Sequence, residues 1–211
     1  MRFRDRTQAG RLLAEYLQHY KDRLDVLVLA LPRGGVPVAR EVAAALKAPL
    51  DVFMVRKLGV PGQEELGMGA IASGGVRTVN DELVRDLGIS NEMIEFVTSQ
   101  EQKELERRER LYRGNRPPPP IGGRSVIVVD DGLATGWTMK AAVAAIRQQQ
   151  PARVIVAVPA APPEICDELR QEADEVVCAL TPQGFSSVGG CYEDFPQTTD
   201  EEVRDLLRQV A

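Results

Sequence analysis

Cysteine, histidine and aromatic residues are scarce in this chain of 211 residues. The three cysteines, Cys166, Cys178 and Cys191, are odd in number, widely spaced and without a C-x-x-C pair, so neither a disulfide framework nor a zinc site is expected. Buried thiols are the expectation instead. The single histidine, His19, falls on the first expected helix, and a general-base role would require geometry that the sequence does not supply.

The chain also lacks an excess of positive charge and any long apolar run. Its net charge of −5 and pI near 5.1 argue against a general nucleic-acid surface, because binding to a phosphate backbone needs clustered positive charge. No run approaches transmembrane length, and no apolar segment follows the charged N-terminus, so we expect a cytoplasmic protein. Two phosphate-binding motifs are missing as well: G-x-x-x-x-G-K-[ST], and G-x-G-x-x-G between a strand and a helix.

What the sequence does contain is an alternation of apolar strands and amphipathic helices, which is typical of an α/β fold with a parallel sheet. Strands are expected at 25–31, 50–55, 126–129, 154–158 and 176–180, with a return to the sheet at 67–73, and helices at 137–149 and 163–172. We expect a single domain, made of a core (about 1–79 and 121–182), a helical insertion (about 80–120) and a C-terminal segment (about 183–211).

The segment 126–139 carries most of the functional information. Val126 to Val129 predict a central strand covered on both faces, and Asp130 and Asp131 follow at its carboxyl end, where open α/β sheets bind ligands. The small residues after them let backbone N–H groups close on a phosphate, and Thr135 and Thr138 add hydroxyl donors at a helix N-terminus. The two carboxylates suit neighbouring diol hydroxyls or a hydrated Mg²⁺.

Residues 126–139 resemble the phosphoribosyl pyrophosphate (PRPP) signature of type I phosphoribosyltransferases, in which a hydrophobic strand precedes two acidic residues and a Thr-Gly-x-Thr loop. The resemblance implies a three-layer fold with a mostly parallel, twisted sheet flanked by helices, and a C-terminal segment that serves as a hood. It implies that Asp130 and Asp131 hold the ribose hydroxyls. The 5′-phosphate site would then consist of Gly132, Leu133, Ala134, Thr135, Gly136, Trp137 and Thr138. Mg²⁺ would be held mainly through PRPP and water, with Asp130 and Asp131 as further candidate ligands.

A second turn, Pro32-Arg33-Gly34-Gly35, follows the first expected strand. Taken alone it is either a plain glycine turn or a phosphate site, since two glycines permit close backbone approach and Arg33 supplies a fixed charge. In the resembling family this turn binds pyrophosphate, often through a non-proline cis peptide bond, which here would join Pro32 and Arg33. Gly34 and Gly35 would then contact the pyrophosphate.

Arg56 and Lys57 fall in a Gly- and Pro-punctuated segment, 56–62, that we expect to be a flexible loop. They match in kind the basic residues with which the family's loop closes over pyrophosphate, although solvated loop charges account for them as well. The expected catalytic residues are therefore Asp130, Asp131, Arg33 and Lys57.

The sequence leaves the acceptor open. The hypoxanthine-guanine branch of the family carries an aspartate where this chain has Ala134, so we place hypoxanthine and guanine below adenine or a non-purine ring. Proton handling by Glu64 and Glu65 competes with simple surface solvation. Stacking on a base competes equally with packing against the C-terminal helix for three aromatic residues, Phe185, Tyr192 and Phe195.

The expected function is Mg²⁺-dependent transfer of a 5-phosphoribosyl group from PRPP to a nitrogenous base, with release of pyrophosphate. The expected partners are these small molecules, without nucleic acid or membrane, and a homo-oligomer is left open. Two alternatives are kept: a regulatory protein that senses PRPP or a nucleotide without turnover, and a hydrolase of phosphorylated sugars.

Overall fold

The centre of the protein is a five-stranded parallel sheet with the strand order β2-β1-β6-β7-β8. The computed structural model describes residues 2–208, except for the side chain of Glu65, so positions 209–211 of the expected C-terminal segment lie outside it. The strands are β1 (Val26–Ala30), β2 (Leu50–Val52), β6 (Ser125–Val129), β7 (Arg153–Ala160) and β8 (Glu175–Leu180). The prediction of a mostly parallel α/β sheet is confirmed.

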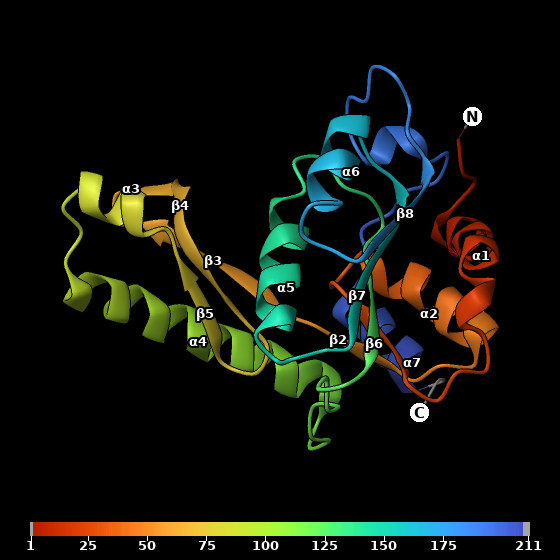
Figure 1. Cartoon of the computed structure of the whole chain (residues 1–211), viewed down its shortest axis with the longest axis horizontal. Helices are drawn as coiled ribbons and strands as arrows, with labels where there is room; N and C mark the ends of the chain where they lie inside the picture. The colour runs from red at the N-terminus through yellow and green to blue at the C-terminus, as the bar shows by residue number, and fades with distance from the viewer. Residues whose placement is uncertain (1, 209–211) are drawn as a thin grey trace.

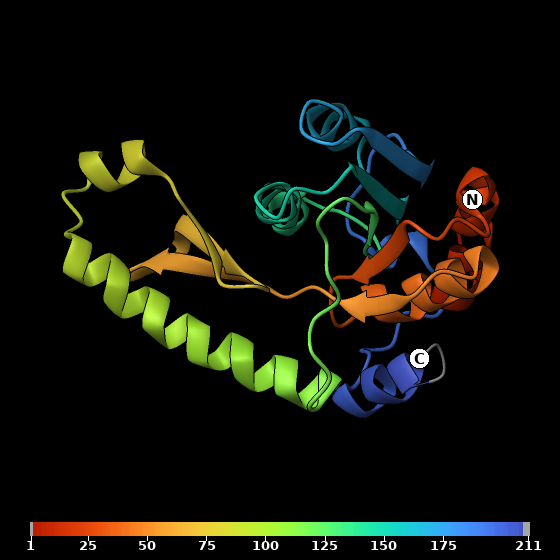
Figure 2. The ribbon, with the colours of Figure 1, turned by 60° about the horizontal axis from the view of Figure 1, so that its bottom comes forward.

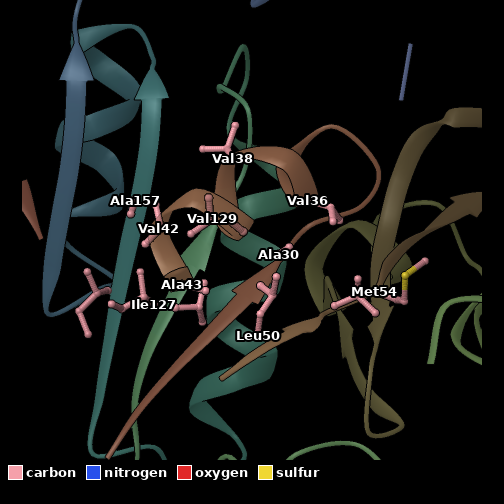
Figure 3. Packing of buried hydrophobic residues seen from close by; sticks show 14 of the residues in the cluster. Ala30, Val36, Val38, Val42, Ala43, Leu50, Met54, Ile127, Val129 and Ala157 are labelled. Atoms are coloured by element: carbon pink, nitrogen blue, oxygen red, sulfur yellow. The ribbon is translucent and has the colours of Figure 1, made fainter. Parts of the chain in front are cut away.

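Helices cover both faces of this sheet (Figure 1). One face carries α1 (Arg6–Tyr16) and α2 (Gly35–Leu46), and the other carries α5 (Trp137–Arg147) and α6 (Pro163–Leu169). Because side chains alternate along a strand, Val28 and Ile127 enter the first core while Leu27 and Val126 enter the second. Figure 3 shows Val42 of α2 in the first of these cores. His19 was expected on the first helix, but α1 ends at Tyr16 and His19 lies in a 3-10 turn that follows it, η1 (Gln18–Tyr20).

A separate arm leaves the edge of the parallel sheet after β2 (Figures 1 and 2). It holds an antiparallel sheet of β3 (Val55–Val60), β4 (Gln63–Ala72) and β5 (Val76–Val79), followed by α3 (Asp81–Asp86) and α4 (Asn91–Arg113). The long helix α4 returns along this sheet to the body of the protein. The helical insertion expected at about 80–120 therefore consists of α3 and α4.

The arm corrects three sequence-based predictions. The strand expected at 50–55 ends at Val52, the expected loop at 56–62 contains strand β3, and the segment 67–73 pairs with β3 and β5 instead of joining the parallel sheet. A tight turn after Val60, in which Gly62 has a φ of +78°, reverses the chain and pairs β3 with β4. At the base of the hairpin, the backbone N–H of Met54 donates to Ser73 Oγ at 2.8 Å.

The C-terminal segment crosses the carboxyl end of the sheet and returns to the helices. It contains η2 (Gly189–Cys191) and α7 (Asp200–Arg208), which packs against α2 and α4. A capping box begins α7, because Thr199 N–H donates to Glu202 Oε2 at 2.7 Å and Glu202 N–H donates to Thr199 Oγ1 at 3.1 Å. No helix within residues 2–208 is long and apolar enough to cross a membrane.

Candidate active site

The two turns singled out in the sequence lie side by side at the carboxyl end of the sheet. Strands β1 and β6 are direct neighbours, with Ala30 paired to Val129. The chain leaves β1 toward β2 on one side and leaves β6 toward β7 on the other, so the strand order reverses between β1 and β6. Ligands of open α/β sheets bind at such a reversal.

Two glycines allow the two turns to touch. A Cβ built on Gly34 would lie 2.0 Å from Asp131 Oδ2, and one on Gly35 would lie 2.7 Å from the Val129 carbonyl oxygen. The sequence predicts that these glycines serve close approach to a phosphate, and the structure shows in addition their close approach to the acidic turn. The peptide bond between Pro32 and Arg33 is cis, as predicted.

Asp130 and Asp131 are packed into this junction. The Asp131 backbone N–H donates to Asp130 Oδ1 at 2.8 Å, and Arg6 Nε donates to Asp131 Oδ2 at 2.8 Å. Burial raises the pKa of Asp130 well above its ordinary value, and the neighbouring charge of Asp131 raises it further. Burial also raises the pKa of Asp131, although the Arg6 guanidinium opposes this shift. Burial therefore makes the ionised form of these carboxyls less stable until ligand hydroxyls or a bound cation interact with them.

Sequence reasoning missed Arg6. Its side chain is only 10% exposed, its Nη1 donates to the Pro196 carbonyl at 2.6 Å, and its guanidinium lies 3.8 Å from the centre of the Phe195 ring. The residue is separated from Asp131 by 125 positions and lies in a charged N-terminal run without any motif, so no local signal could identify it.

The aromatic residues proposed to stack on a base support this junction instead of offering open faces. Tyr192 is buried, its hydroxyl donates to the Asp131 carbonyl at 2.6 Å, and its ring contacts Phe3 and Phe195 at centroid distances of 5.4 and 4.8 Å. Phe185 packs against the same apolar cluster. Phe195 does line the cavity described below, but Arg6 and Tyr192 both contact its ring.

The loop from Gly132 to Thr138 leads from the acidic pair into α5. Gly132 and Gly136 have φ values of +153° and +69°, and a Cβ at Gly136 would lie 2.6 Å from Ile165 Cγ2. Gly136 is the N-cap of α5 and provides no side-chain acceptor for the first N–H groups of the helix. With exposed Thr135 and Thr138 beside these donors, the loop has the composition and geometry of an anion site.

A cavity of about 470 Å³ opens where the two turns meet. Arg6, Arg33, Gly34 and Asp131 line one part of it, and Val188 with the segment 195–198 lines the rest. Arg33 is held loosely, since its Nη1 lies 3.8 Å from Asp200 Oδ1 and a third of its side chain is exposed. The cavity thus combines two guanidinium groups with one carboxylate.

Arg56 and Lys57 lie in a different hollow. This hollow, of about 690 Å³, separates β3 and α4 from the start of α5 and is also lined by Glu64, Trp137 and Thr138. Arg56 forms an ion pair with Glu101 at 2.6 Å. The structure therefore places the two cations of β3 beside the end of the loop 132–138 and apart from Arg33.

His19 and Glu64, two further polar candidates, do not line the cavity between the two turns. His19 is half exposed and lies 3.3 Å from Glu175 at the start of β8, which is the opposite end of the strands from the two turns. Glu64 lines the second hollow, and the side chain of Glu65 is outside the described residues. Among the residues that the structure describes, no group of three or more His, Cys, Asp or Glu side chains could hold a metal ion. Asp130 and Asp131 by themselves suit a cation whose remaining ligands are water and the phosphates of a substrate.

A parallel sheet with an acidic pair and a glycine-bounded anion loop at its switch point is the arrangement of the phosphoribosyltransferases. The family description "Phosphoribosyl transferase domain" matches residues 6–194, and the chain belongs to this family.

Two similar relatives come from Mycobacterium tuberculosis. "Putative phosphoribosyl transferase Rv0571c" (strain ATCC 25618 / H37Rv) and "Putative phosphoribosyl transferase MT0597" (strain CDC 1551 / Oshkosh) are each 48% identical over 205 residues, which cover 97% of this chain and 46% of theirs. The chain thus spans about half the length of these curated relatives. The crystal structure of TT1426 from Thermus thermophilus is also similar, with 43% identity, a TM-score of 0.88 and complete coverage of both chains.

Proposed function

We propose that the protein transfers a 5-phosphoribosyl group from PRPP to a nitrogenous base and releases pyrophosphate in a Mg²⁺-dependent reaction. The observation that carries the proposal is the contact between the turn 32–35 and the acidic pair 130–131, beside an anion-binding loop. Ribose hydroxyls, a 5′-phosphate and a pyrophosphate need three adjoining sites of this kind, and few other ligands combine them.

Each part of PRPP then has a place. Asp130 and Asp131 accept hydrogen bonds from the ribose hydroxyls, and the loop 132–138 holds the 5′-phosphate with backbone N–H groups and the hydroxyls of Thr135 and Thr138. The turn 32–35 and Arg33 hold the pyrophosphate within the 470 Å³ cavity. Mg²⁺, bound mainly through PRPP and water, would neutralise charge on the leaving pyrophosphate.

The reaction breaks the bond between C1 of the ribose and the pyrophosphate oxygen, and it forms a bond from C1 to a ring nitrogen of the acceptor, which loses its proton. Positive charge grows on the ribose ring, where the two carboxylates favour it. Negative charge grows on pyrophosphate, where Arg33 and backbone amides stabilise it. One preorganised donor of this kind lowers the activation barrier by about 3–4 kcal/mol in comparable sites. Arg56 and Lys57 are proposed to add charge from the arm.

For the acceptor, the hollow beside the phosphate loop offers the better wall. Trp137, Met93 and Phe96 line it and are respectively 37%, 41% and 59% exposed. Apolar and aromatic side chains that remain exposed in a concave site are suited to a planar base. The sequence-based assignment named Phe185, Tyr192 and Phe195, and of these three only Phe195 lines a cavity of the site. The three residues of the hollow are proposed in addition to them.

The test is incubation of the protein with PRPP, Mg²⁺ and a panel of purines, pyrimidines and other ring amides, with pyrophosphate release as the readout. We expect release with one acceptor class, and slower release with guanine and hypoxanthine because Ala134 stands where the hypoxanthine-guanine branch of the family has an aspartate. Tight PRPP binding without turnover on any acceptor would favour the regulatory alternative. Phosphate release without a base would favour the hydrolase.

A further inference from the structure

The end of α4 lies beside α7 (Figure 2). A second cationic cavity opens there, and it shares no lining residue with the two hollows of the candidate active site. Its volume is about 310 Å³, and four of its lining residues are arginines: Arg113, Arg116, Arg204 and Arg208. None of the residues that line it in the described part of the chain is acidic. In a protein with a net charge of −5, such a cluster is a local exception.

The four arginines differ in how well they are neutralised. Arg113 is buried and structural, because its Nε donates to Asp51 Oδ2 at 3.0 Å and its Nη2 donates to the Val52 carbonyl at 3.1 Å. Arg116 Nε reaches the Arg113 carbonyl at 3.4 Å, which neutralises no charge. Arg208 is exposed, and its Nη1 lies 3.7 Å from Asp205.

Arg204 provides the most informative observation. Its Nε is buried, yet it has no hydrogen-bond partner within residues 2–208. A buried cationic donor without an acceptor costs free energy, so such groups are normally paired. An anion in the cavity would supply the acceptor that this nitrogen lacks.

The helix ends oppose an anion only weakly. The C-termini of α4 and α7 each carry about half a negative charge, whereas Arg116 and Arg204 each carry a full positive charge, and Arg208 adds a third that Asp205 offsets only in part. Among the described residues, the balance of charge in the cavity is therefore positive. Guanidinium groups also match phosphate oxygens in a two-pronged geometry, which favours phosphate over a monovalent halide.

We propose that this cavity binds a compact anion with two or more linked phosphate groups, such as the phosphate chain of a nucleoside di- or triphosphate. The cationic groups come from two elements, Arg116 just beyond α4 and Arg204 within α7. A single phosphate pairs well with one guanidinium fork, while a chain of phosphates can pair with both elements.

The cavity is connected to the active site through α7. Asp200, at the start of that helix, accepts a hydrogen bond from the hydroxyl of Tyr112 at 2.6 Å and lies 3.8 Å from Nη1 of Arg33. Tyr112 also lines the arginine cavity. A ligand that draws α4 and α7 together therefore acts on the residues that face Arg33. This coupling rests on the proposed function, but the binding itself does not.

The binding test is calorimetric titration of tripolyphosphate into the full chain carrying Arg33→Ala, which removes a cation of the active-site cavity. In this background we expect Arg204→Ala to weaken binding about tenfold or more, and Arg204→Lys to weaken it less. The matched control is Arg170→Ala, which removes an equal charge from the exposed ion pair with Asp167 on α6 and should change nothing. Equal affinities for Arg204→Ala and Arg170→Ala would overturn the site.

Three further measurements complete the test. Titration with inorganic phosphate should be at least tenfold weaker than with tripolyphosphate, and equal affinities would contradict the requirement for linked phosphates. Titration with ATP distinguishes the two kinds of ligand. Tighter binding of ATP than of tripolyphosphate would indicate a nucleotide, and equal affinities would indicate an inorganic polyphosphate. Weaker binding of ATP would overturn nucleotides as ligands. If Arg204→Ala unfolds the protein, the ¹⁵N–¹H signal of Arg204 Nε in the Arg33→Ala chain must shift with tripolyphosphate. Absence of phosphoribosyl transfer would leave all these results unchanged, so the two proposals fail separately.

Discussion

At the scale of single residues, Asp131 is where the contacts of the candidate active site converge. Its carboxylate accepts from Arg6, its backbone carbonyl accepts from Tyr192, and its Oδ2 occupies the space that a side chain at Gly34 would need. Three distant segments of the chain thus contact one residue, and Arg6 holds its carboxylate. Such fixation suits a residue that must orient ligand hydroxyls, because the orientation is established before the ligand arrives.

Replacing both Asp130 and Asp131 with Asn should abolish tight PRPP binding without unfolding the protein. The shape is kept, but the acceptors for hydroxyls and Mg²⁺ lose their charge, and each charge-assisted hydrogen bond contributes about 1.5–3 kcal/mol. We expect a loss of at least about tenfold in calorimetric affinity for PRPP with Mg²⁺. Since burial raises the pKa of both carboxyls, their ionised forms cost stability near neutral pH, and the melting temperature should not fall by much. Unchanged affinity in a folded double variant would refute the assignment, and Asp167→Asn on α6 is the exposed control.

Arg33→Ala tests the pyrophosphate turn separately. Arg33 lines the cavity but makes only a 3.8 Å contact with Asp200, so its loss should disturb the fold little. Its charge should matter for ligands that carry pyrophosphate. We expect affinities for PRPP and pyrophosphate to fall about 10- to 100-fold, and the affinity for ribose 5-phosphate to change far less. Equal losses for the three ligands, measured by the same titration, would mean that the turn only supports the fold.

At the scale of elements, the site depends on how closely two strand-to-helix turns pack. The turn after β1 and the turn after β6 are neighbours because their strands are paired in register, and glycine is the residue that lets them touch. The N–H groups at the start of α5 then face the same end of the sheet as the acidic pair. The geometry of the site is thus a property of the sheet's strand order as much as of its side chains.

Gly34→Ala should therefore damage both stability and ligand binding. The new Cβ would lie 2.0 Å from Asp131 Oδ2, so the carboxylate or the turn must move. Overpacking of this kind costs about 1–3 kcal/mol in the free energy of unfolding, which denaturant titration would measure, and PRPP binding should fall with it. Gly122→Ala is the matched control, because its Cβ would meet only the Gln149 carbonyl at 3.6 Å. Equal, small effects of the two substitutions would show that the turns are free to separate.

The parts that the sequence predicted well are those with strong local patterns. The apolar run 126–129 and the acidic pair after it identified the central strand and the end of the sheet where we propose that ligands bind. Both turns were recognised, although their mutual contact was not. The arm was predicted less well. Its strand β3 contains Arg56, Lys57 and Gly59, which do not alternate regularly, so the hairpin resembled a loop. Arg6 could not be found at all, because its partner is 125 positions away.

At the scale of the whole molecule, the protein consists of a buried parallel sheet and an arm that extends from its edge (Figure 1). The two parts differ in how they are stabilised. Strands β1 and β6 are wholly buried between helices, whereas β3 and β5 are half-buried. The arm is nevertheless joined to the body by side-chain hydrogen bonds, among them one from Arg113 to Asp51 and one from Tyr112 to Asp200.

Amide hydrogen exchange can test whether the arm takes part in ligand binding. Without ligand, exchange should be slowest in β1 and β6 and faster in β3 to β5, because local opening is easier where fewer apolar contacts are lost. With PRPP and Mg²⁺, peptides covering 31–35 and 130–138 should slow. If Arg56 and Lys57 also contact the pyrophosphate, the segment 56–64 should slow with them, while α3, without any buried residue, serves as an internal reference. Slowing at 130–138 with no change at 56–64 would show that the two cations of β3 do not bind PRPP, and their hollow beside Trp137 would then belong to the acceptor alone.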